Sequence, residues 1–305
     1  MRTRSQWTKM SIGDTDEREG EYMKTCLVLE GGAMRSLYTS GVLDVFMSQN
    51  IDIDCTIGVS AGALVGSNYV SNQKGRAACI NIQYCKDSRY IGVKALKNNK
   101  GLFGFDYLFG DICKVEKPFD EEAFFNSHKR FVAGATNCVT GKTEYFEKDR
   151  ENLYKILQAS SSMPLVSKIV EINGQPYLDG AIDCNVPIDW ALEQGYEKIV
   201  TVLTRDKGYQ KEPVPDKMKK VYNKVYKSYP YLVESIGNRP EKYNQIYQRI
   251  QKLEEEKKIF VLQPKTPIVV SKLERNPEKL KKLYKQGIEE AEEKLPALKQ
   301  YLGYT

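Results

Sequence analysis

Ser60 lies in the sequence pattern that most clearly predicts chemistry in this chain. It is the centre of Gly58-Val59-Ser60-Ala61-Gly62, a GxSxG pattern. An apolar run ends at Val59 and small residues open the next segment, which is typical of a strand–serine–helix turn that exposes a nucleophile at the end of a sheet. Such a turn strains the backbone, and the helix N-terminus favours developing negative charge. The alternative is an ordinary strand-to-helix turn with a capping serine.

A nucleophilic serine needs a base, and histidine is a poor candidate here. The sequence contains one histidine, His128, which lies in a polar run just before an expected strand. No histidine follows a C-terminal acid, as the order of an α/β-hydrolase triad would require. We therefore expect His128 at the surface, and a carboxylate or a lysine as the base.

Asp179, in Asp179-Gly180-Ala181, is the candidate base. A carboxylate accepts a serine proton best when partial burial raises its pKa. Gly180 would let the backbone approach another loop closely. An Asp-Gly pair is also a common turn, and the spacing does not exclude Asp183 or Asp189.

A glycine-rich segment, Glu30-Gly31-Gly32-Ala33-Met34-Arg35-Ser36, follows the first apolar run. Acyl transfer needs N–H donors aimed at a tetrahedral oxyanion, and a strand-to-helix loop of this kind offers free amides. The rival reading is a phosphate-binding loop, but neither GxGxxG nor GxxxxGK[ST] is present. Arg35 would either fix the loop by hydrogen bonding or meet a phosphate.

The three motifs together resemble the patatin-like phospholipase family, most closely its bacterial serine-esterase members. That family has a GGGx[RK]G loop, a GxSxG turn and an AspGly[AlaGly] motif in the same order, and the resemblance covers residues 25 to about 205. It implies a three-layer α/β/α sandwich with a mostly parallel sheet. It also implies a Ser60–Asp179 dyad that hydrolyses acyl esters of phospholipids or lysophospholipids through an acyl-enzyme, without metal or cofactor.

The resemblance assigns roles to further residues of the three motifs. It implies that amides of the glycine-rich loop donate to the oxyanion, namely those of Gly31, Gly32, Ala33 and Met34. It also implies that Arg35 supports this loop. The glycines that it assigns to the tight turns are Gly58, Gly62 and Gly180. Two positions depart from the family pattern, because Ala33 and Ser36 replace glycines. If position 33 needs a left-handed backbone, which alanine resists, one amide donor to the oxyanion would point away from it. The alternative function is a catalytically weak or inactive lipid- or protein-binding module on the same fold.

Elements that could position these motifs alternate along the first two thirds of the chain. Apolar runs separated by helix-length spacers favour a mostly parallel sheet covered on both faces. The expected strands are 25–30, 55–59, 130–135, 198–204 and 259–262, with an edge strand near 176–178, and the expected helices are 35–48, 61 to the low seventies and 151–159. The aromatic- and glycine-rich region 86–118 has no clean period, so we expect a long irregular excursion over the sheet.

Three segments are expected in the chain as a whole. Residues 1–20 read as a disordered leader, 21–205 as the catalytic domain, and 206–305 as a helical C-terminal extension with one strand near 259–263. The extension should hold a helix opened by Pro213 and Pro215, a second helix after Pro240, and a third from an Asn276 N-cap to near Leu302.

Charge separates the chain into two parts. Residues 1–204 carry 23 basic and 26 acidic side chains, whereas residues 205–305 carry 23 and 14. Such asymmetry suggests an anionic partner or a solvated helix. The resemblance favours a lipid surface over nucleic acid, with contacts to an anionic membrane through Lys217, Lys220, Lys224, Tyr222 and Tyr226. The simpler alternative is a helix whose apolar stripe packs on the core while its lysines are solvated.

Cysteine usage and hydropathy indicate the compartment. The seven cysteines form no CxxC pair, which argues against disulfides or a zinc site and favours a reducing compartment. No apolar run approaches the ~20 residues that span a bilayer. We therefore expect a cytoplasmic protein that is peripheral to the membrane if the basic segment binds lipid.

Overall fold

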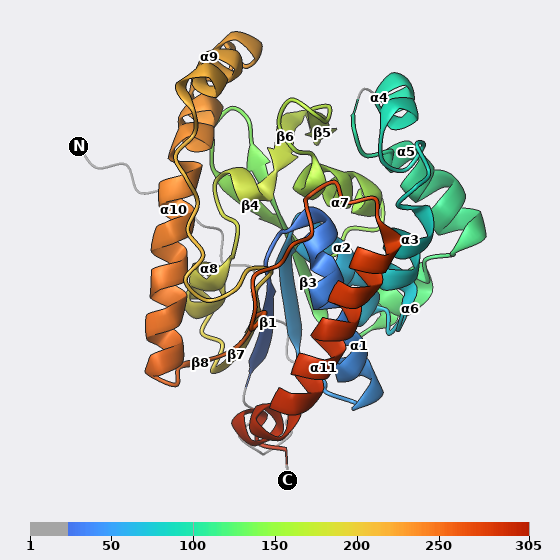
Figure 1. Ribbon diagram of the computed structural model, residues 1–305, viewed down its shortest axis with the longest axis vertical. Coiled ribbons are helices and arrows are strands. Elements are labelled where there is room, and N and C mark those ends of the chain that lie inside the picture. Colours follow the sequence, from blue (N-terminus) through green and yellow to red (C-terminus); the bar gives the residue numbers. More distant parts are fainter. Residues whose placement is uncertain (1–23, 100, 305) are drawn as a thin grey trace.

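The computed structural model describes residues 24–99 and 101–304 (Figure 1). The expected leader at 1–20 lies outside the described residues. Within the described part, one eight-stranded sheet has the order β5-β6-β3-β2-β1-β7-β8, and β4 also pairs with β3. The strands are β1 (Thr25–Leu29), β2 (Cys55–Val59), β3 (Arg130–Asn137), β4 (Thr143–Phe146), β5 (Val170–Ile172), β6 (Gln175–Asp179), β7 (Lys198–Val202) and β8 (Ile259–Leu262).

The centre of the sheet is parallel, as the apolar strands predict. Strands β3, β2, β1, β7 and β8 run parallel to one another. Strands β4 and β6 pair with β3 in antiparallel fashion, and β5 pairs with β6 in the same way. Strand β1 is buried on both faces, with Leu27 and Leu29 in one core and Cys26 and Val28 in the other. Alternate residues of a strand point to opposite faces, so near-continuous apolar strands need helices on both sides.

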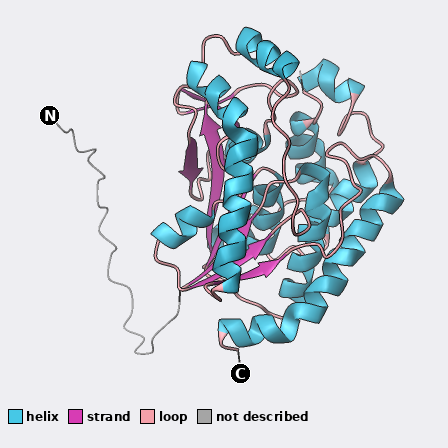
Figure 2. Cartoon of the chain, turned by 60° about the vertical axis from the view of Figure 1, so that its left-hand side comes forward, coloured by secondary structure: helices cyan, strands magenta, loops and turns pink. Residues whose placement is uncertain are grey.

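Helices complete the expected α/β/α sandwich (Figures 1 and 2). One face packs on α1 (Leu37–Ser48), α2 (Ala61–Val70), α7 (Leu153–Ser161) and α11 (Pro277–Leu302). The other face packs on α8 (Ile188–Glu193) and α10 (Pro230–Glu255), and Figure 2 shows α10 lying across the sheet. Among the described helices, none is long and apolar enough to cross a membrane.

The C-terminal third is built into both helical layers. Helix α11 packs on α1 so closely that a Cβ on Gly287 would lie 2.2 Å from the Tyr38 carbonyl oxygen. The Tyr38 hydroxyl also donates a hydrogen bond of 2.9 Å to Glu290 of α11. Since β8 pairs with β7 at the sheet edge, the segment after residue 205 completes the sheet as well as its covers.

The region 86–118 is helical, and the expectation of an irregular excursion is wrong. Helices α3 (Arg76–Tyr84), α4 (Val93–Asn99) and α5 (Phe105–Tyr107) lead into a π-helix, η2 (Leu108–Glu116). A π-helix bonds residue i to i+5 rather than i+4, so its apolar residues do not repeat every 3.6 positions. The short remaining elements are η1 (Ala33–Ser36), α6 (Glu121–Asn126), η3 (Gly180–Ile182) and α9 (Asp216–Val225).

Two element boundaries also differ from the sequence prediction. The run at 176–178 belongs to β6, which lies between β5 and β3 and is therefore an inner strand. Helix α10 begins with Pro230 at its first position and continues through Pro240. A proline usually starts or breaks a helix, which is why Pro240 suggested a start. The helix from the Asn276 cap is confirmed, because that side chain accepts from the Glu278 and Lys279 amides.

Candidate active site

Sheet register brings Ser60 and Asp179 together across β3. Val59, at the end of β2, pairs with Gly134 of β3, and Asp179, at the end of β6, pairs with Ala135. The Ser60 hydroxyl then donates a hydrogen bond of 2.8 Å to Oδ2 of Asp179. A carboxylate in this position can take the proton of a serine that attacks a carbonyl.

Ser60 lies on a strained turn between β2 and α2. Its φ of 57° and ψ of −130° are unusual for a residue with a side chain, and such backbone strain gathers at functional sites. The Ser60 amide donates to Oγ of Ser160 at 2.8 Å, and that hydroxyl donates to the Gly134 carbonyl at 2.7 Å. Ser160 of α7 therefore holds the turn in place, a role that the sequence patterns did not reveal.

The turn depends on glycines for close contact. A Cβ on Gly62 would lie 2.6 Å from the Leu29 carbonyl oxygen, and one on Gly58 would lie 2.6 Å from the Gly62 carbonyl carbon. Gly180 is equally confined, because its Cβ would lie 2.3 Å from the Gly134 carbonyl oxygen. The glycines that the motifs singled out thus let α2 and the Asp179 turn approach the ends of the strands.

Asp179 is buried in an environment that suits a base. It is 3% exposed, and its Oδ1 accepts the Ala181 amide at 2.8 Å. Burial raises the pKa of Asp179, while Arg239, the Ala181 amide and the Ser60 hydroxyl oppose that rise. A carboxylate with a raised pKa is a stronger proton acceptor than an ordinary aspartate.

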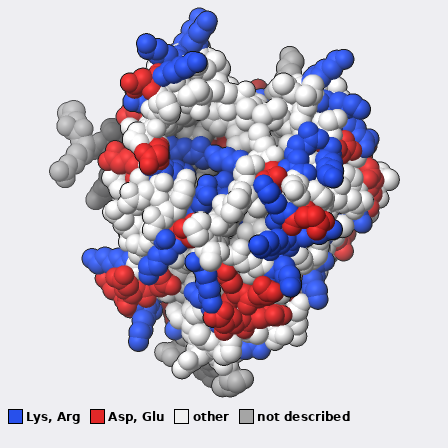
Figure 3. Space-filling view, viewed as in Figure 1, with Lys and Arg blue, Asp and Glu red and all other residues white. Residues whose placement is uncertain are grey.

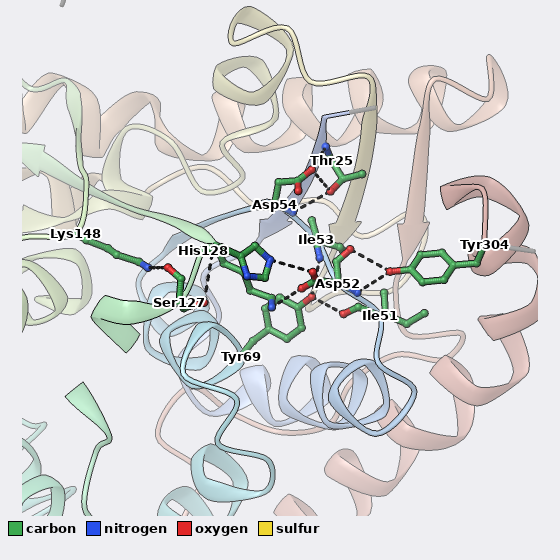
Figure 4. Close-up of polar contacts among 11 residues, drawn as sticks. Thr25, Ile51, Asp52, Ile53, Asp54, Tyr69, Ser127, His128, Lys148 and Tyr304 are labelled. Carbon is green, nitrogen blue, oxygen red and sulfur yellow. Dashed lines mark hydrogen bonds and ion pairs between the residues drawn. The ribbon is translucent and has the colours of Figure 1, made fainter. Parts of the chain in front are cut away.

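The other titratable candidates lie elsewhere. Asp183 forms an ion pair with Lys242, and Asp189 pairs with Arg249 at 3.0 Å. His128 has a side chain that is 62% exposed and contacts Asp52 at 2.9 Å before β3 begins (Figure 4), so its predicted surface position is confirmed. Among the described residues, no group of three or more His, Cys, Asp and Glu side chains is placed to hold a metal ion.

The glycine-rich loop offers fewer free amides than the motif suggests. The Gly31 amide donates to the Asn185 carbonyl at 3.3 Å, and the Met34 amide donates to the Lys272 carbonyl at 3.4 Å. These two expected oxyanion donors are therefore already engaged, which corrects their assignment. Within the described chain, the Gly32 and Ala33 amides have no acceptor, so they are the loop donors left for an oxyanion.

Ala33 adopts the left-handed backbone that a glycine at this position would favour. Its φ is 49°, a conformation that costs a residue with a Cβ about 1–2 kcal/mol. Ser36, the other departure from the pattern, donates its hydroxyl to the Ala33 carbonyl at 2.8 Å. The serine thus holds the strained alanine in place, and the two departures belong together.

Arg35 does not support the loop by hydrogen bonding, contrary to the expectation. Its side chain is 5% exposed, its Nε is buried without a partner, and it forms no hydrogen bond or ion pair with a described residue. Burial and the neighbouring Arg205 lower the pKa of Arg35, and Glu30 opposes them. A buried guanidinium without a partner is costly and points to a missing anion.

Glu30 anchors the loop instead, and sequence reasoning missed it. This buried carboxylate accepts from the Asn185 side chain at 2.7 Å and from the Thr204 amide. It also accepts from the hydroxyls of Tyr243 and Tyr247 of α10, at 3.0 and 2.7 Å. The spacing of the two tyrosines, one helical turn apart, is the signal in the sequence that could have suggested a shared partner.

Ser60 lines an apolar pocket. Helices α2, α3, α5 and η2 contribute much of the wall. Because α5 and η2 belong to the region 86–118, this region covers the site as a helical cap. Lining side chains include Met34, Leu64, Ile80, Phe103, Phe105 and Phe109. A wall of this composition suits an acyl chain, because burial of each CH₂ group contributes about 0.8 kcal/mol.

The proposed membrane contacts on α9 lie at one end of the molecule (Figure 1). Lys217, Lys220 and Lys224 are exposed. Tyr226 is 6% exposed, packs in a small core with Leu178 and Leu232, and its hydroxyl accepts the Leu165 amide at 2.8 Å. Tyr226 is therefore a packing residue in this structure and not a free interfacial ring.

The fold and the site define a class: an α/β/α protein with a serine on a strand–helix turn and a carboxylate hydrogen-bonded to it. A family model described as patatin-like phospholipase matches residues 27–192, more than half of the chain. The chain therefore belongs to the patatin-like phospholipase family, a family of lipid hydrolases. A second model, described as a domain of unknown function (DUF6363), matches residues 229–303.

The chain is also similar to individual proteins. The uncharacterized protein YjjU of Escherichia coli K12 is 28% identical over 250 residues, which cover 80% of this chain and 70% of that protein. The probable lipid hydrolase 463L of Invertebrate iridescent virus 6 is 25% identical over 193 residues, which cover 58% of this chain and 66% of that protein. VipD from Legionella pneumophila is 11% identical, with a TM-score of 0.41, over 90% of this chain and 67% of VipD.

Proposed function

We propose that this protein is a serine acyl hydrolase that cleaves carboxylic esters of lipids, with Ser60 as nucleophile and Asp179 as base. The hydrogen bond from Ser60 Oγ to Asp179 Oδ2, with Ser60 in the lining of an apolar pocket, carries the proposal. The printed name of the viral relative, a probable lipid hydrolase, supports the same reaction class.

In the first half of the reaction, Ser60 Oγ attacks the ester carbonyl carbon while its proton passes to Oδ2 of Asp179. The Gly32 and Ala33 amides stabilise the oxyanion. As the tetrahedral intermediate collapses, the carbon–oxygen bond to the alcohol breaks and Asp179 returns the proton to the leaving oxygen. The products are the free alcohol and an acyl group bound to Ser60.

In the second half, Asp179 takes a proton from water, and the hydroxide attacks the acyl carbonyl. Collapse of this intermediate breaks the bond to Ser60 Oγ, which recovers its proton from Asp179. The fatty acid then leaves. The apolar pocket holds the acyl chain throughout and keeps bulk water away from most of it.

A kinetic comparison tests this proposal. We expect the wild type to hydrolyse p-nitrophenyl and lipid acyl esters, with kcat lowered at least 10³-fold by Ser60→Ala and by Asp179→Asn. A fluorophosphonate probe should label Ser60 in the folded wild type. Absence of both turnover and labelling, beside a related esterase that labels, would favour the non-catalytic lipid- or protein-binding module.

Docking on an anionic membrane stays a separate proposal, supported by the exposed Lys217, Lys220 and Lys224 of α9. Clustered lysines attract anionic headgroups through charge that salt screens. Sedimentation with vesicles should show binding to anionic but not neutral lipid, lost when the three lysines are changed to glutamine. Equal binding to both vesicle types would refute electrostatic docking.

A further inference from the structure

Five basic side chains gather near the carboxyl ends of the parallel strands. Figure 3 shows Lys and Arg side chains in a hollow between α10 and the segment that leads to α11. Four of the five come from the chain after residue 204, and none lines the apolar pocket. We call them the basic hollow: Arg35, Arg205, Lys211, Arg239 and Lys272.

The members of the basic hollow act on one another and on the dyad. Arg239, Lys272 and Arg35 lower the pKa of Lys211, whose pKa falls to about 5 chiefly because it is desolvated. Desolvation, Arg239 and Arg35 lower the pKa of Lys272 to about 8. Arg239 and Lys272 also act on Asp179. The basic side chains are therefore close enough to change one another's pKa and that of Asp179.

No carboxylate among the described residues forms an ion pair with this cluster. Neighbouring cations on α10 differ, since Lys242 pairs with Asp183 and Arg249 pairs with Asp189. Lys211 Nζ lies 3.3 Å from the centre of the Tyr243 ring, and the Arg205 guanidinium lies 4.2 Å from that of Tyr209. These contacts with aromatic rings bring no carboxylate to the two side chains.

The two acids nearest the hollow are already committed. Glu30 accepts four hydrogen bonds, from Asn185, Thr204, Tyr243 and Tyr247. Asp179 accepts from Ser60 and Ala181. In addition, Nε of Arg35 and Nε of Arg239 are buried without partners. Unpaired buried cations destabilise a fold, and an anionic ligand between them would relieve that cost.

Phosphate has the chemistry that this arrangement fits. Guanidinium groups bind phosphate oxygens through paired N–H donors, and lysines add point charge. Open α/β sheets bind ligands outside the carboxyl ends of their strands, which is where the basic hollow lies. A carboxylate ligand would offer fewer oxygens and less negative charge to the cations of the hollow.

We infer that the basic hollow binds the phosphate of a lipid substrate and selects headgroups that carry no compensating cation. The inference rests on the proposed function, since it places the acyl chain in the apolar pocket, the ester at Ser60 and the phosphate beyond it. A choline or ethanolamine ammonium would be repelled by the three arginines and Lys272 of the hollow, none of which forms an ion pair with a described carboxylate. Phosphatidate-type monoester headgroups and their lyso forms are the substrates that match best.

Binding can be measured without turnover in the full-length Ser60→Ala variant. Calorimetric titration should use lysophosphatidic acid, lysophosphatidylcholine and a monoacylglycerol with one acyl chain, each below its aggregation concentration. We expect lysophosphatidic acid to bind at least tenfold more tightly than either of the others. Equal affinity for the three lipids overturns the inference even if the wild type proves to be an active esterase.

Inorganic phosphate separates a lipid headgroup from a free anion. It should bind the same variant at least tenfold more weakly than lysophosphatidic acid, because it cannot use the apolar pocket. If inorganic phosphate binds as tightly as the lysolipid, the hollow binds phosphate, and the assignment of that phosphate to a lipid headgroup is wrong.

Variants of the hollow supply the second test. Arg239→Gln and Lys272→Met should each lower the affinity for lysophosphatidic acid about tenfold or more and reduce the ratio of kcat/KM for this lipid over the monoacylglycerol. Lys282→Met, which removes an exposed lysine of α11, is the matched control and should change neither quantity. Two folded hollow variants with wild-type affinity and ratio would overturn the assignment.

Discussion

The hydroxyl of Ser160 joins the amide of Ser60 to the Gly134 carbonyl of β3. The residue that accepts the nucleophile's own N–H therefore lies 100 positions along the chain, on another helix. This contact fixes the backbone of the serine turn from outside the turn itself. It separates the positioning of Ser60 from its activation by Asp179.

Ser160→Ala should therefore lower kcat by about tenfold and leave KM nearly unchanged. The variant leaves a buried amide without its acceptor, which costs about 1–3 kcal/mol and loosens the turn. Ser160→Thr keeps the hydroxyl and should restore part of kcat. Ser162→Ala is the control, because within the described chain that hydroxyl donates only to the Gln158 carbonyl of α7. A loss of stability with wild-type kcat would show that Ser160 is structural alone.

Ala33→Gly should raise the free energy of unfolding by about 0.5–1 kcal/mol. Relief of the left-handed strain exceeds the extra freedom that glycine has in the unfolded chain. Denaturation in urea measures the change. The same substitution at Ala123, in helix α6, should destabilise the protein by a similar amount. A destabilised Ala33→Gly variant would contradict the strain at this position.

The acidic limb of the kcat/KM profile should report Asp179. Burial raises the pKa of Asp179. As the pH is lowered, the base should therefore become protonated, and activity should be lost, already above the pH range in which an ordinary aspartate titrates. Arg239 opposes that rise, so Arg239→Gln should move the limb to still higher pH. A limb at the pKa of an ordinary aspartate, unmoved in the variant, would argue against Asp179 as base.

The contribution of Asp179 to stability should change with pH in the opposite direction to its contribution to activity. The folded state holds the proton more tightly than the unfolded state, so stability decreases as pH rises from the unfolded to the folded pKa. Asp179→Asn should remove this contribution and flatten the decrease. Urea denaturation of both proteins across the acidic range checks the sign, and identical pH profiles would contradict it.

Glu30→Gln should destabilise the protein by about 3 kcal/mol or more. Glutamine has one acceptor oxygen for four donors, and its amide hydrogens would face donors. Tyr247→Phe removes one of these bonds and should cost about 1–2 kcal/mol. A double-mutant cycle measures their coupling. Additive effects of the two changes would show that the contact does not anchor α10 to the loop.

Local patterns predicted the central strands and the serine turn, because each depends on residues close in sequence. Asp179 was chosen as the base from the resemblance of the three motifs together, since its partner Ser60 lies 119 positions away. The π-helix escaped prediction because its repeat differs from the helical pattern that the sequence was searched for. Ser160, Glu30 and Arg239 escaped because their roles depend on partners far along the chain. Tyr247, for example, lies 217 positions from the carboxylate that it contacts.

The charge asymmetry of the sequence has a counterpart in the structure beyond α9. The excess of lysine and arginine after residue 204 first suggested the α9 surface as a lipid contact. The fold carries four of those cations, from Arg205 to Lys272, back to the ends of the strands beside the dyad. Sequence spacing could not show this, because loops and α10 deliver them separately.

The acyl-enzyme tests the central claim most directly. Wild-type protein mixed with a p-nitrophenyl acyl ester and quenched in acid within milliseconds to seconds should gain the mass of one acyl group. Peptide mapping by mass spectrometry should place that group on Ser60, and Ser60→Ala should show no such gain. Turnover by wild type with the acyl group on another residue, or retained turnover in Ser60→Ala, would contradict the account.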